Sequence, residues 1–272
     1  MTDPTAILEL SRDAFILRPL PGAARLLVND GYRGAQIVDC PTAAVVAKIP
    51  FPEDVEVFVV GEWHVEPRGA WSLAIDPERP AFGLLLDHAL CTARRVAFPQ
   101  TMGMLSGAAW FDPGPQIATY DGLLWGLHGD ALVLEPASES LLAWAARVKA
   151  AIPDFDRYSQ VRTDLACGQA FVRGPESALV GTVGIPDAAA RLVPGQPEIL
   201  ALAGFGGDLW VGFEERVERR SGSRSEVFFE CPPEEYLLDV SAVRSGGRGH
   251  LAVLTSSQDQ RRSVLRLFDI PA

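Results

Sequence analysis

The chain has 272 residues, 48% of them hydrophobic and 22% charged, which is typical of a globular protein with a large core and excludes general disorder. A formal net charge of −11, from 35 acidic and 24 basic side chains, argues against nucleic-acid binding. No apolar stretch approaches the roughly eighteen residues that span a bilayer, and the first residues do not resemble a secretory signal. We therefore expect a cytoplasmic protein without membrane contact.

Prolines end short apolar, β-favouring runs at regular places along the chain. These prolines are Pro41, Pro99, Pro136, Pro194, Pro232 and Pro271, spaced 58, 37, 58, 38 and 39 residues apart. Proline cannot donate to a strand ladder, so it marks the ends of strands and the turns between units. A period near 40 residues with about four short strands per unit is typical of β-propeller blades.

The first three units each have four predicted strands. The first has strands over 15–18, 25–29, 36–40 and 45–49; the second over 55–60, 71–75, 82–86 and 94–98; the third over 105–110, 116–120, 123–127 and 131–134. Turn signals at 29–31 and 120–122 contain glycine, which tolerates a positive φ between strands. The pattern predicts consecutive four-stranded sheets.

The segment 138–152 differs, because its apolar residues recur with helical spacing. Ser138 or Ser140 can cap its start, and Pro153 stops it. We predict one helix inserted between units, which explains one of the 58-residue intervals. Trp144 lies one residue off the apolar stripe and is a candidate contact for a partner protein.

Further strands are predicted over 169–172, 179–183, 199–203, 209–213 and 226–229, then over 236–240, 250–255 and 264–268. The last unit lacks a fourth strand, and the apolar run 6–10 at the N-terminus is available for it. Such pairing of the first and last segments leaves no open sheet edge. The count is about six units, with the fifth one strand short.

The segment 236–270 resembles a blade of WD40 or YVTN-like β-propellers, with Leu-Asp-Val, a glycine turn, Leu-Ala-Val-Leu and then Leu-Arg-Leu-Phe-Asp-Ile. Leu-Val-Asn-Asp-Gly at 27–31, followed by Ile-Val-Asp at 37–39, is similar to them too. The Trp-Asp pair that marks true WD40 repeats is absent. The resemblance implies an all-β, single-domain propeller over residues 1–272, and the alternative is a β-sandwich that uses the same strands.

Motifs whose spacing is set by a catalytic mechanism are absent. The chain has no H-E-x-x-H, no P-loop and no G-x-S-x-G. Gly-Phe-Gly-Gly-Asp at 204–208 superficially resembles a dinucleotide-binding loop, but a strand-like segment follows it, so a hairpin turn is the better interpretation. The four cysteines, Cys40, Cys91, Cys167 and Cys231, lie far apart, and we expect reduced thiols.

The most suggestive local cluster is Glu62-Trp63-His64-Val65-Glu66. On a strand, Glu62, His64 and Glu66 share one face, which could bind a cation or a ligand amine. The same face could equally be the solvent side of an edge hairpin. Trp63 adds an aromatic group to this candidate ligand site.

Two of the four histidines have nearby acids: His88 follows Asp87, and His128 lies two residues before Asp130. Either acid could orient its imidazole, and a hydrogen-bonded or solvated turn residue is the simpler interpretation. No two histidines have metal-ligand spacing in the sequence.

The segment 214–226, rich in both charges with serine and glycine, is predicted as a long solvated hairpin loop. We expect a partner protein to contact this segment and the helix at 138–152. Arg219 and Arg220 are the candidate contacts within the segment. We therefore predict a non-enzymatic protein-interaction or scaffold module with a protein partner, no cofactor and no metal. The alternative is a hydrolase or lactonase-like enzyme with a divalent cation in the central channel, by analogy with six-bladed propeller enzymes.

Overall fold

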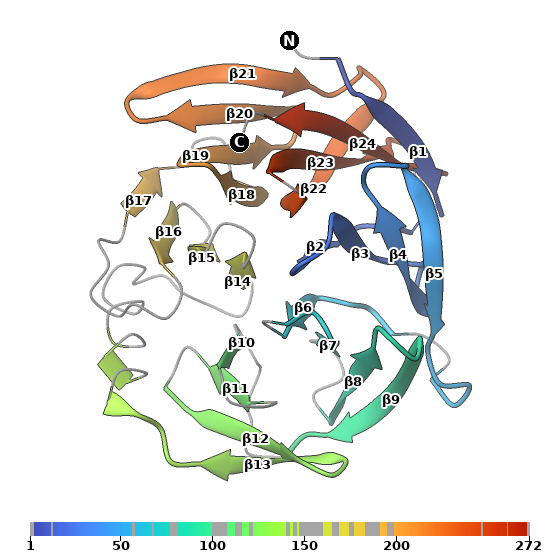
Figure 1. The fold of residues 1–272 in the computed structure, drawn as a ribbon, viewed down its shortest axis with the longest axis vertical. Helices are drawn as coiled ribbons and strands as arrows, with labels where there is room; N and C mark the ends of the chain where they lie inside the picture. Colours follow the sequence, from blue (N-terminus) through green and yellow to red (C-terminus); the bar gives the residue numbers. More distant parts are fainter. Residues whose placement is uncertain are drawn as a thin grey trace. The chain divides into compact units, whose positions relative to one another are not determined.

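The computed structural model describes residues 3–11, 13–55, 58–66, 68–76, 81–99, 108–111, 116–119, 122–139, 142–143, 146, 160–164, 169–173, 177–182, 191–194, 199–245, 247–259 and 261–270. The chain divides into two compact units. One contains residues 1–50 and 197–272, and the other contains residues 51–196. Both consist of short antiparallel strands (Figure 1).

The unit formed by the two ends of the chain has three four-stranded sheets. Its strands are β1 (Ala6–Leu10), β2 (Leu17–Leu20), β3 (Arg25–Asn29), β4 (Gly34–Asp39), β5 (Ala44–Pro50), β18 (Ala201–Phe205), β19 (Asp208–Phe213), β20 (Arg216–Ser221), β21 (Arg224–Glu230), β22 (Glu235–Ser245), β23 (Arg248–Ser257) and β24 (Ser263–Ile270). The sheet orders are β2-β3-β4-β5, β18-β19-β20-β21 and β1-β24-β23-β22.

The middle unit has the same four-strand pattern. Its strands are β6 (Glu62–Val65), β7 (Trp71–Ile75), β8 (Phe82–Asp87), β9 (Thr92–Ala97), β10 (Ala108–Phe111), β11 (Gln116–Thr119), β12 (Leu124–His128), β13 (Ala131–Glu135), β14 (Gln160–Asp164), β15 (Gln169–Arg173), β16 (Ser177–Thr182) and β17 (Arg191–Pro194). β14 to β17 form one sheet. Among the described residues, the parallel bridge between Ala97 and Ala131 joins β6–β9 and β10–β13 into a second sheet.

The N-terminal segment completes the last sheet, as predicted. β1 pairs antiparallel with β24 over five residues, from Ala6 opposite Leu267 to Leu10 opposite Ser263. Ala6, Leu8 and Leu10 pack against the core between the two sheets β1-β24-β23-β22 and β2–β5. Strand alternation places Ile7 and Glu9 on the opposite, outward side. The two ends of the chain are thus held in one sheet (Figure 1).

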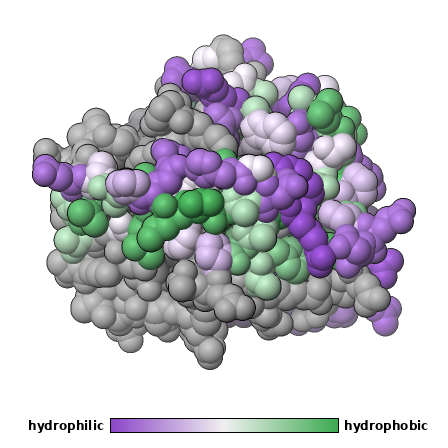
Figure 2. Space-filling model, turned by 90° about the horizontal axis from the view of Figure 1, so that it is seen from below, coloured by the Kyte–Doolittle hydropathy of each residue, from purple (hydrophilic) through white to green (hydrophobic). Residues whose placement is uncertain are grey.

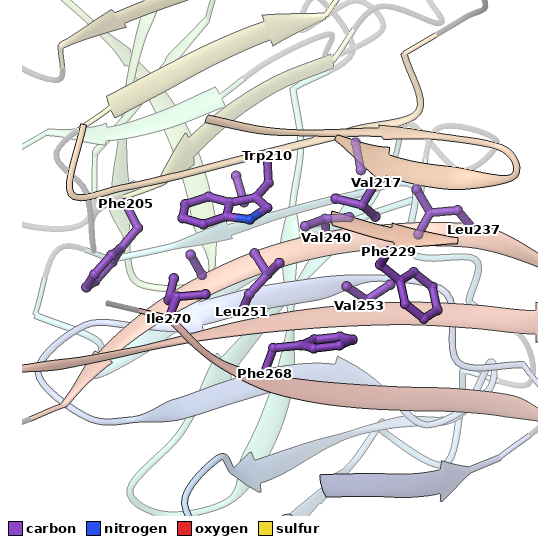
Figure 3. Packing of buried hydrophobic residues seen from close by; sticks show 13 residues of the cluster. Phe205, Trp210, Val217, Phe229, Leu237, Val240, Leu251, Val253, Phe268 and Ile270 are labelled. Carbon is purple, nitrogen blue, oxygen red and sulfur yellow. The ribbon is translucent and has the colours of Figure 1, made fainter. Parts of the chain in front are cut away.

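The central strands of the last sheet are apolar on both faces because a sheet packs against each face. One face contributes to a cluster with β18–β21 that contains Trp210, Phe229 and Phe268 (Figure 3). The other contributes Val243, Leu254 and several neighbours to the core with β2–β5. This explains why β23 is buried along nearly its whole length and has the unbroken apolar run Leu-Ala-Val-Leu at its centre rather than an alternating pattern.

A buried ionic network lies at one end of this sheet. The Arg266 guanidinium donates to both carboxylate oxygens of Glu235, at 2.7 and 3.1 Å, and also to the Thr255 hydroxyl oxygen at 2.7 Å. The Thr255 hydroxyl donates to the same carboxylate at 2.6 Å. All three residues are buried. Burial raises the pKa of Glu235, but hydrogen bonds from Arg266 and Thr255 outweigh this and hold it below its usual 4.5.

Asp239 of β22 connects two sheets of the same unit. Its carboxylate accepts the backbone N–H of Leu17 at 2.8 Å and lies 3.1 Å from the Arg18 guanidinium, both on β2. Arg18 and Asp239 are buried. Because a buried charge needs a partner, this ion pair helps to fix β2 against β22.

The predicted strand over 55–60 is wrong. Val55, Phe58 and Val60 are buried, but they are outside any strand, and the first strand of this sheet is β6. The backbone N–H of Val59 is bound at 3.1 Å by the carboxylate of Asp76 instead of by a neighbouring strand. The hydrophobic residues therefore correctly indicated a buried segment here. The hydrogen-bonded strands of the sheet, however, begin only in the more polar segment that follows, at β6.

The hairpin predicted over 214–226 is present, but most of it is strand rather than solvated loop. β20 and β21 form a hairpin whose turn lies at Gly222 and Ser223. The strands carry charge because ion pairs within the sheet neutralise it, such as Arg219 with Asp208. β20 supplies the strand that the fifth unit lacked. The Gly206-Gly207 turn is a hairpin, as predicted, and both glycines have a positive φ.

The helix predicted over 138–152 falls mostly outside the described residues, and so does Trp144. Within it, the backbone N–H of Leu142 donates to the carbonyl oxygen of Ser138 at 3.1 Å, which is helical spacing. One such bond does not establish the helix, which stays a prediction. In the part of the chain that the structure describes, no helix is long and apolar enough to cross a bilayer.

Candidate functional site

The cluster at 62–66 forms β6 and the residue that follows it. Trp63 and His64 lie on opposite faces of the strand, yet both are buried, so the polar face is not a solvent face. The carboxylate of Glu66 accepts the backbone N–H of Ala70 at 3.0 Å and thereby shapes the hairpin between β6 and β7. The side chain of Glu62 lies outside the described residues. A ligand at this strand stays a prediction.

A chain of hydrogen bonds starts at Trp63 and leaves the strand. The indole N–H of Trp63 donates to Ser72 Oγ at 2.9 Å, and Ser72 Oγ lies 2.8 Å from His88 Nε2. His88 Nδ1 lies 2.7 Å from the carbonyl oxygen of Gly69 at the tip of the β6–β7 hairpin. We call these four groups the Trp63–Gly69 relay. It connects three elements: β6, the β6–β7 hairpin with β7, and the turn after β8.

The two ends of the relay fix the direction of its protons. An indole N–H can only donate, and a carbonyl oxygen can only accept. His88 therefore carries its proton on Nδ1, and its Nε2 accepts the hydroxyl proton of Ser72. Burial lowers the pKa of His88 below its usual 6.5, although the Gly69 bond and the nearby Asp87 and Glu66 carboxylates act in the opposite direction. The relay thus favours a neutral imidazole.

The hydroxyl and imidazole of the relay have the spacing of a nucleophile and its base, but not the access. Ser72 has 0% of its surface exposed, so no substrate reaches its oxygen. A nucleophile needs a reacting atom next to it. The arrangement is therefore structural: it holds the β6–β7 hairpin to the turn after β8. Sequence reasoning missed it because its members lie 9 and 16 residues apart in different elements.

The acids next to the two histidines have other partners. Asp87 accepts the backbone N–H groups of Ala89 and Leu90 at 2.9 and 2.8 Å, which builds the turn after β8. Asp130 is paired with Arg94. His128 instead contacts Glu135 at 3.0 Å, and this hydrogen bond lowers the pKa of Glu135. Neither acid orients its neighbouring imidazole.

Two large apolar side chains are exposed at the end of the sheet that the relay holds. Trp71, the first residue of β7, is 37% exposed, and Leu90, in the turn after β8, is 73% exposed. Trp71 is paired with Asp87, and the backbone N–H of His88 donates to the carbonyl oxygen of Ala70 at 3.1 Å, so both turns lie at the same end. We call this surface, with Trp71 and Leu90, the Trp71–Leu90 end. Exposed aromatic and leucine side chains at a rigid sheet end are suited to docking another protein.

The predicted partner contacts of the β20–β21 hairpin are engaged within the sheet. The Arg219 guanidinium binds Asp208 at 2.5 to 2.8 Å, and Arg220 lies 3.2 Å from Glu218. The two arginines are neighbours in β20 and therefore point to opposite faces. The 62–66 cluster belongs to the other unit.

A second exposed apolar surface lies on β13, where Val133 and Leu134 are 47% and 54% exposed. Figure 2, seen from the side on which Figure 1 draws β12 and β13, shows hydrophobic surface bordered by hydrophilic surface. These two residues are neighbours in a strand and alternate between its faces. Val133 and Leu134 serve as control positions for Trp71 and Leu90, because all four residues belong to the same unit.

The described residues show no metal-binding group of three or more His, Cys, Asp and Glu side chains. Cys40, Cys91 and Cys231 are free thiols, and Cys167 lies outside the described residues. Burial raises the pKa of Cys40 and of Cys231 to about 12. Since the thiolate is the reactive form, these two thiols are inert at neutral pH.

No protein-family model matches the sequence, and no curated protein is similar to it. Solved structures do match. The β-propeller domain of Cps50 (Swd1) from Myceliophteria thermophila is 9% identical with a TM-score of 0.58, covering 97% of this chain and 99% of that one. A structure of the mitotic checkpoint complex matches with 11% identity and a TM-score of 0.56, covering 100% of this chain and 93% of that one. The WD40 repeats of RRP9 match with 14% identity and a TM-score of 0.52, covering 100% and 86%. The likeness favours the propeller over the sandwich, and the chain therefore has the all-β fold of WD40-type β-propellers.

Proposed function

We propose that this protein is a non-enzymatic interaction module that docks a partner protein on the Trp71–Leu90 end. The observation that carries the proposal is the exposure of Trp71, at the start of β7, and of Leu90, in the turn after β8, at a sheet end that the relay and Asp87 hold in place. A binding surface that is already ordered loses little conformational entropy when a partner docks.

The fold supports the same proposal. We infer that the 24 strands make six four-stranded blades, the last of which is closed by β1. Blades of this kind present their turns on rigid rims, and turns carry binding function when a scaffold fixes them. The similar structures include a chain of the mitotic checkpoint complex, which is by its name a multi-component assembly. The metal-dependent hydrolase alternative has no observation among the described residues that favours it.

The test compares two double variants in a quantitative capture experiment from cells that naturally make the protein. Trp71→Ala with Leu90→Ala should reduce the recovery of a specific partner by at least about tenfold, because a central tryptophan often contributes about 2 kcal/mol or more to an interface. Val133→Ala with Leu134→Ala removes similar exposed apolar surface elsewhere in the same unit and should leave recovery unchanged. Circular dichroism and thermal melting check that both variants fold.

The decisive comparison uses the partner that wild type and the β13 variant both recover. Equal recovery of that partner by the Trp71 and Leu90 variant would contradict docking at this end. Loss of every wild-type partner from both double variants would also contradict the proposal, because the effect would then not be specific to the site.

A further inference from the structure

We infer that the Trp63–Gly69 relay is a pH-sensitive lock on the β6–β7 hairpin, closed while His88 is neutral and released when His88 takes up a proton. This inference does not rest on the proposed function. It follows from the chemistry of the four groups and from their burial.

A second proton on the imidazole leaves the relay one hydrogen-bond acceptor short. In the neutral state Ser72 Oγ accepts from Trp63 and passes its own proton to His88 Nε2. Once Nε2 is protonated it becomes a donor, and the Ser72 hydroxyl proton needs a different acceptor. Ser72 is fully buried, so water does not offer one without local opening. Protonation of His88 therefore reverses the Ser72–His88 bond and leaves the Ser72 hydroxyl proton buried without an acceptor, which destabilises the contact between the turn after β8 and β7.

The charged groups around His88 come from two elements. Glu66 lies on the β6–β7 hairpin and Asp87 at the end of β8, and both favour the protonated imidazole. Each carboxylate already accepts backbone N–H groups: Glu66 accepts from Ala70, and Asp87 accepts from Ala89 and Leu90. Arg68 on the same hairpin is exposed. Burial outweighs the two carboxylates, and the pKa of His88 is lowered.

The consequence for stability has a definite sign. Because the folded pKa of His88 is below the unfolded value near 6.5, the unfolded chain binds the extra proton first as pH falls. The stabilisation is complete above pH 6.5 and declines below it, until the folded pKa is reached. The hairpin that carries Gly69 opens over the pH range in which folded His88 itself titrates.

The direct test is a histidine NMR titration of the whole protein. His88 should titrate with a midpoint below 6.5, and the Trp63 indole N–H and the amides of residues 69–71 should lose hydrogen-exchange protection with the same midpoint. In Ser72→Ala the neutral imidazole loses its proton donor, so the His88 midpoint should rise. A midpoint at or above 6.5 in the wild type, unchanged hairpin protection across it, or an unchanged midpoint in Ser72→Ala would each overturn the inference.

A second measurement covers the case in which the chain unfolds before His88 titrates. The folding constant of the wild type, divided by that of His88→Gln, should fall by up to about tenfold per pH unit below 6.5. His128→Gln, which replaces a largely exposed histidine of the same unit, is the control variant. Parallel pH curves for the wild type and His88→Gln would overturn the lock.

Discussion

A chain that lacks residues 1–10 is expected to lose at least about 3 kcal/mol of unfolding free energy, because β1 contributes both a strand ladder and apolar contacts. Five residues pair with β24, and the half-buried Leu8 and Leu10 cover the core beneath. Burial of a leucine side chain contributes about 1.5 to 3 kcal/mol when complete. Removal also leaves β24 as an open edge, which favours association between chains.

Urea denaturation of the full and shortened chains measures this loss, and light scattering detects the association. Ile7→Ala is the matched control, because Ile7 lies in the same strand but faces outward. It should change the free energy by no more than about 0.5 kcal/mol. A shortened chain within about 1 kcal/mol of the full chain would show that the closing strand is dispensable.

Replacement of Arg266 by alanine is the second change with a large expected effect. It leaves the Glu235 carboxylate buried without its main partner, and removal of one member of a buried ion pair costs about 3 to 5 kcal/mol. Arg262→Ala is the control: this arginine is half exposed and lies 3.9 Å from Glu235, so its loss should cost less than about 1 kcal/mol.

The pH dependence of the same network distinguishes lost charge pairing from lost packing. Since the folded pKa of Glu235 is below 4.5, its stabilisation is present above pH 4.5 and is lost as pH falls through the folded pKa. In Arg266→Ala this acid-dependent part should shrink. Glu235→Leu combined with Arg266→Met should recover most of the stability, because apolar packing can replace a buried pair. Equal losses in Arg266→Ala and Arg262→Ala would contradict this account.

Most strands could be predicted from the sequence because the pattern of apolar residues and the residues of turns are local properties of the chain. Asn29 to Gly31 and Gly206-Gly207 end strands wherever they occur, and the apolar runs of β8, β19 and β23 need only a buried sheet to be recognised. The N-terminal strand was also predictable, because a last unit with three strands leaves one edge that an apolar segment can fill.

Sequence patterns failed to predict the structure where other residues supply the ion-pair or hydrogen-bond partners that a segment needs. β20 carries Arg216, Glu218, Arg219 and Arg220, and it is a strand because acids beside it pair with the arginines. Phe58 and Val60 are buried without a ladder, because Asp76 from another element satisfies the backbone between them. The sequence of β14 contains no apolar run, so this strand was not predicted.

The sequence by itself determined the alternation of short strands and turns, the closing role of residues 6–10 and the lack of any motif with catalytic spacing. Only the tertiary structure decided which polar residues act together. No sequence pattern links Trp63, Ser72 and His88 to one another, and they meet because antiparallel pairing folds β6, β7 and the turn after β8 back to one end of a sheet. Hydrogen bonds depend on distances of about 3 Å between atoms, and distances between segments are set by packing rather than by local pattern.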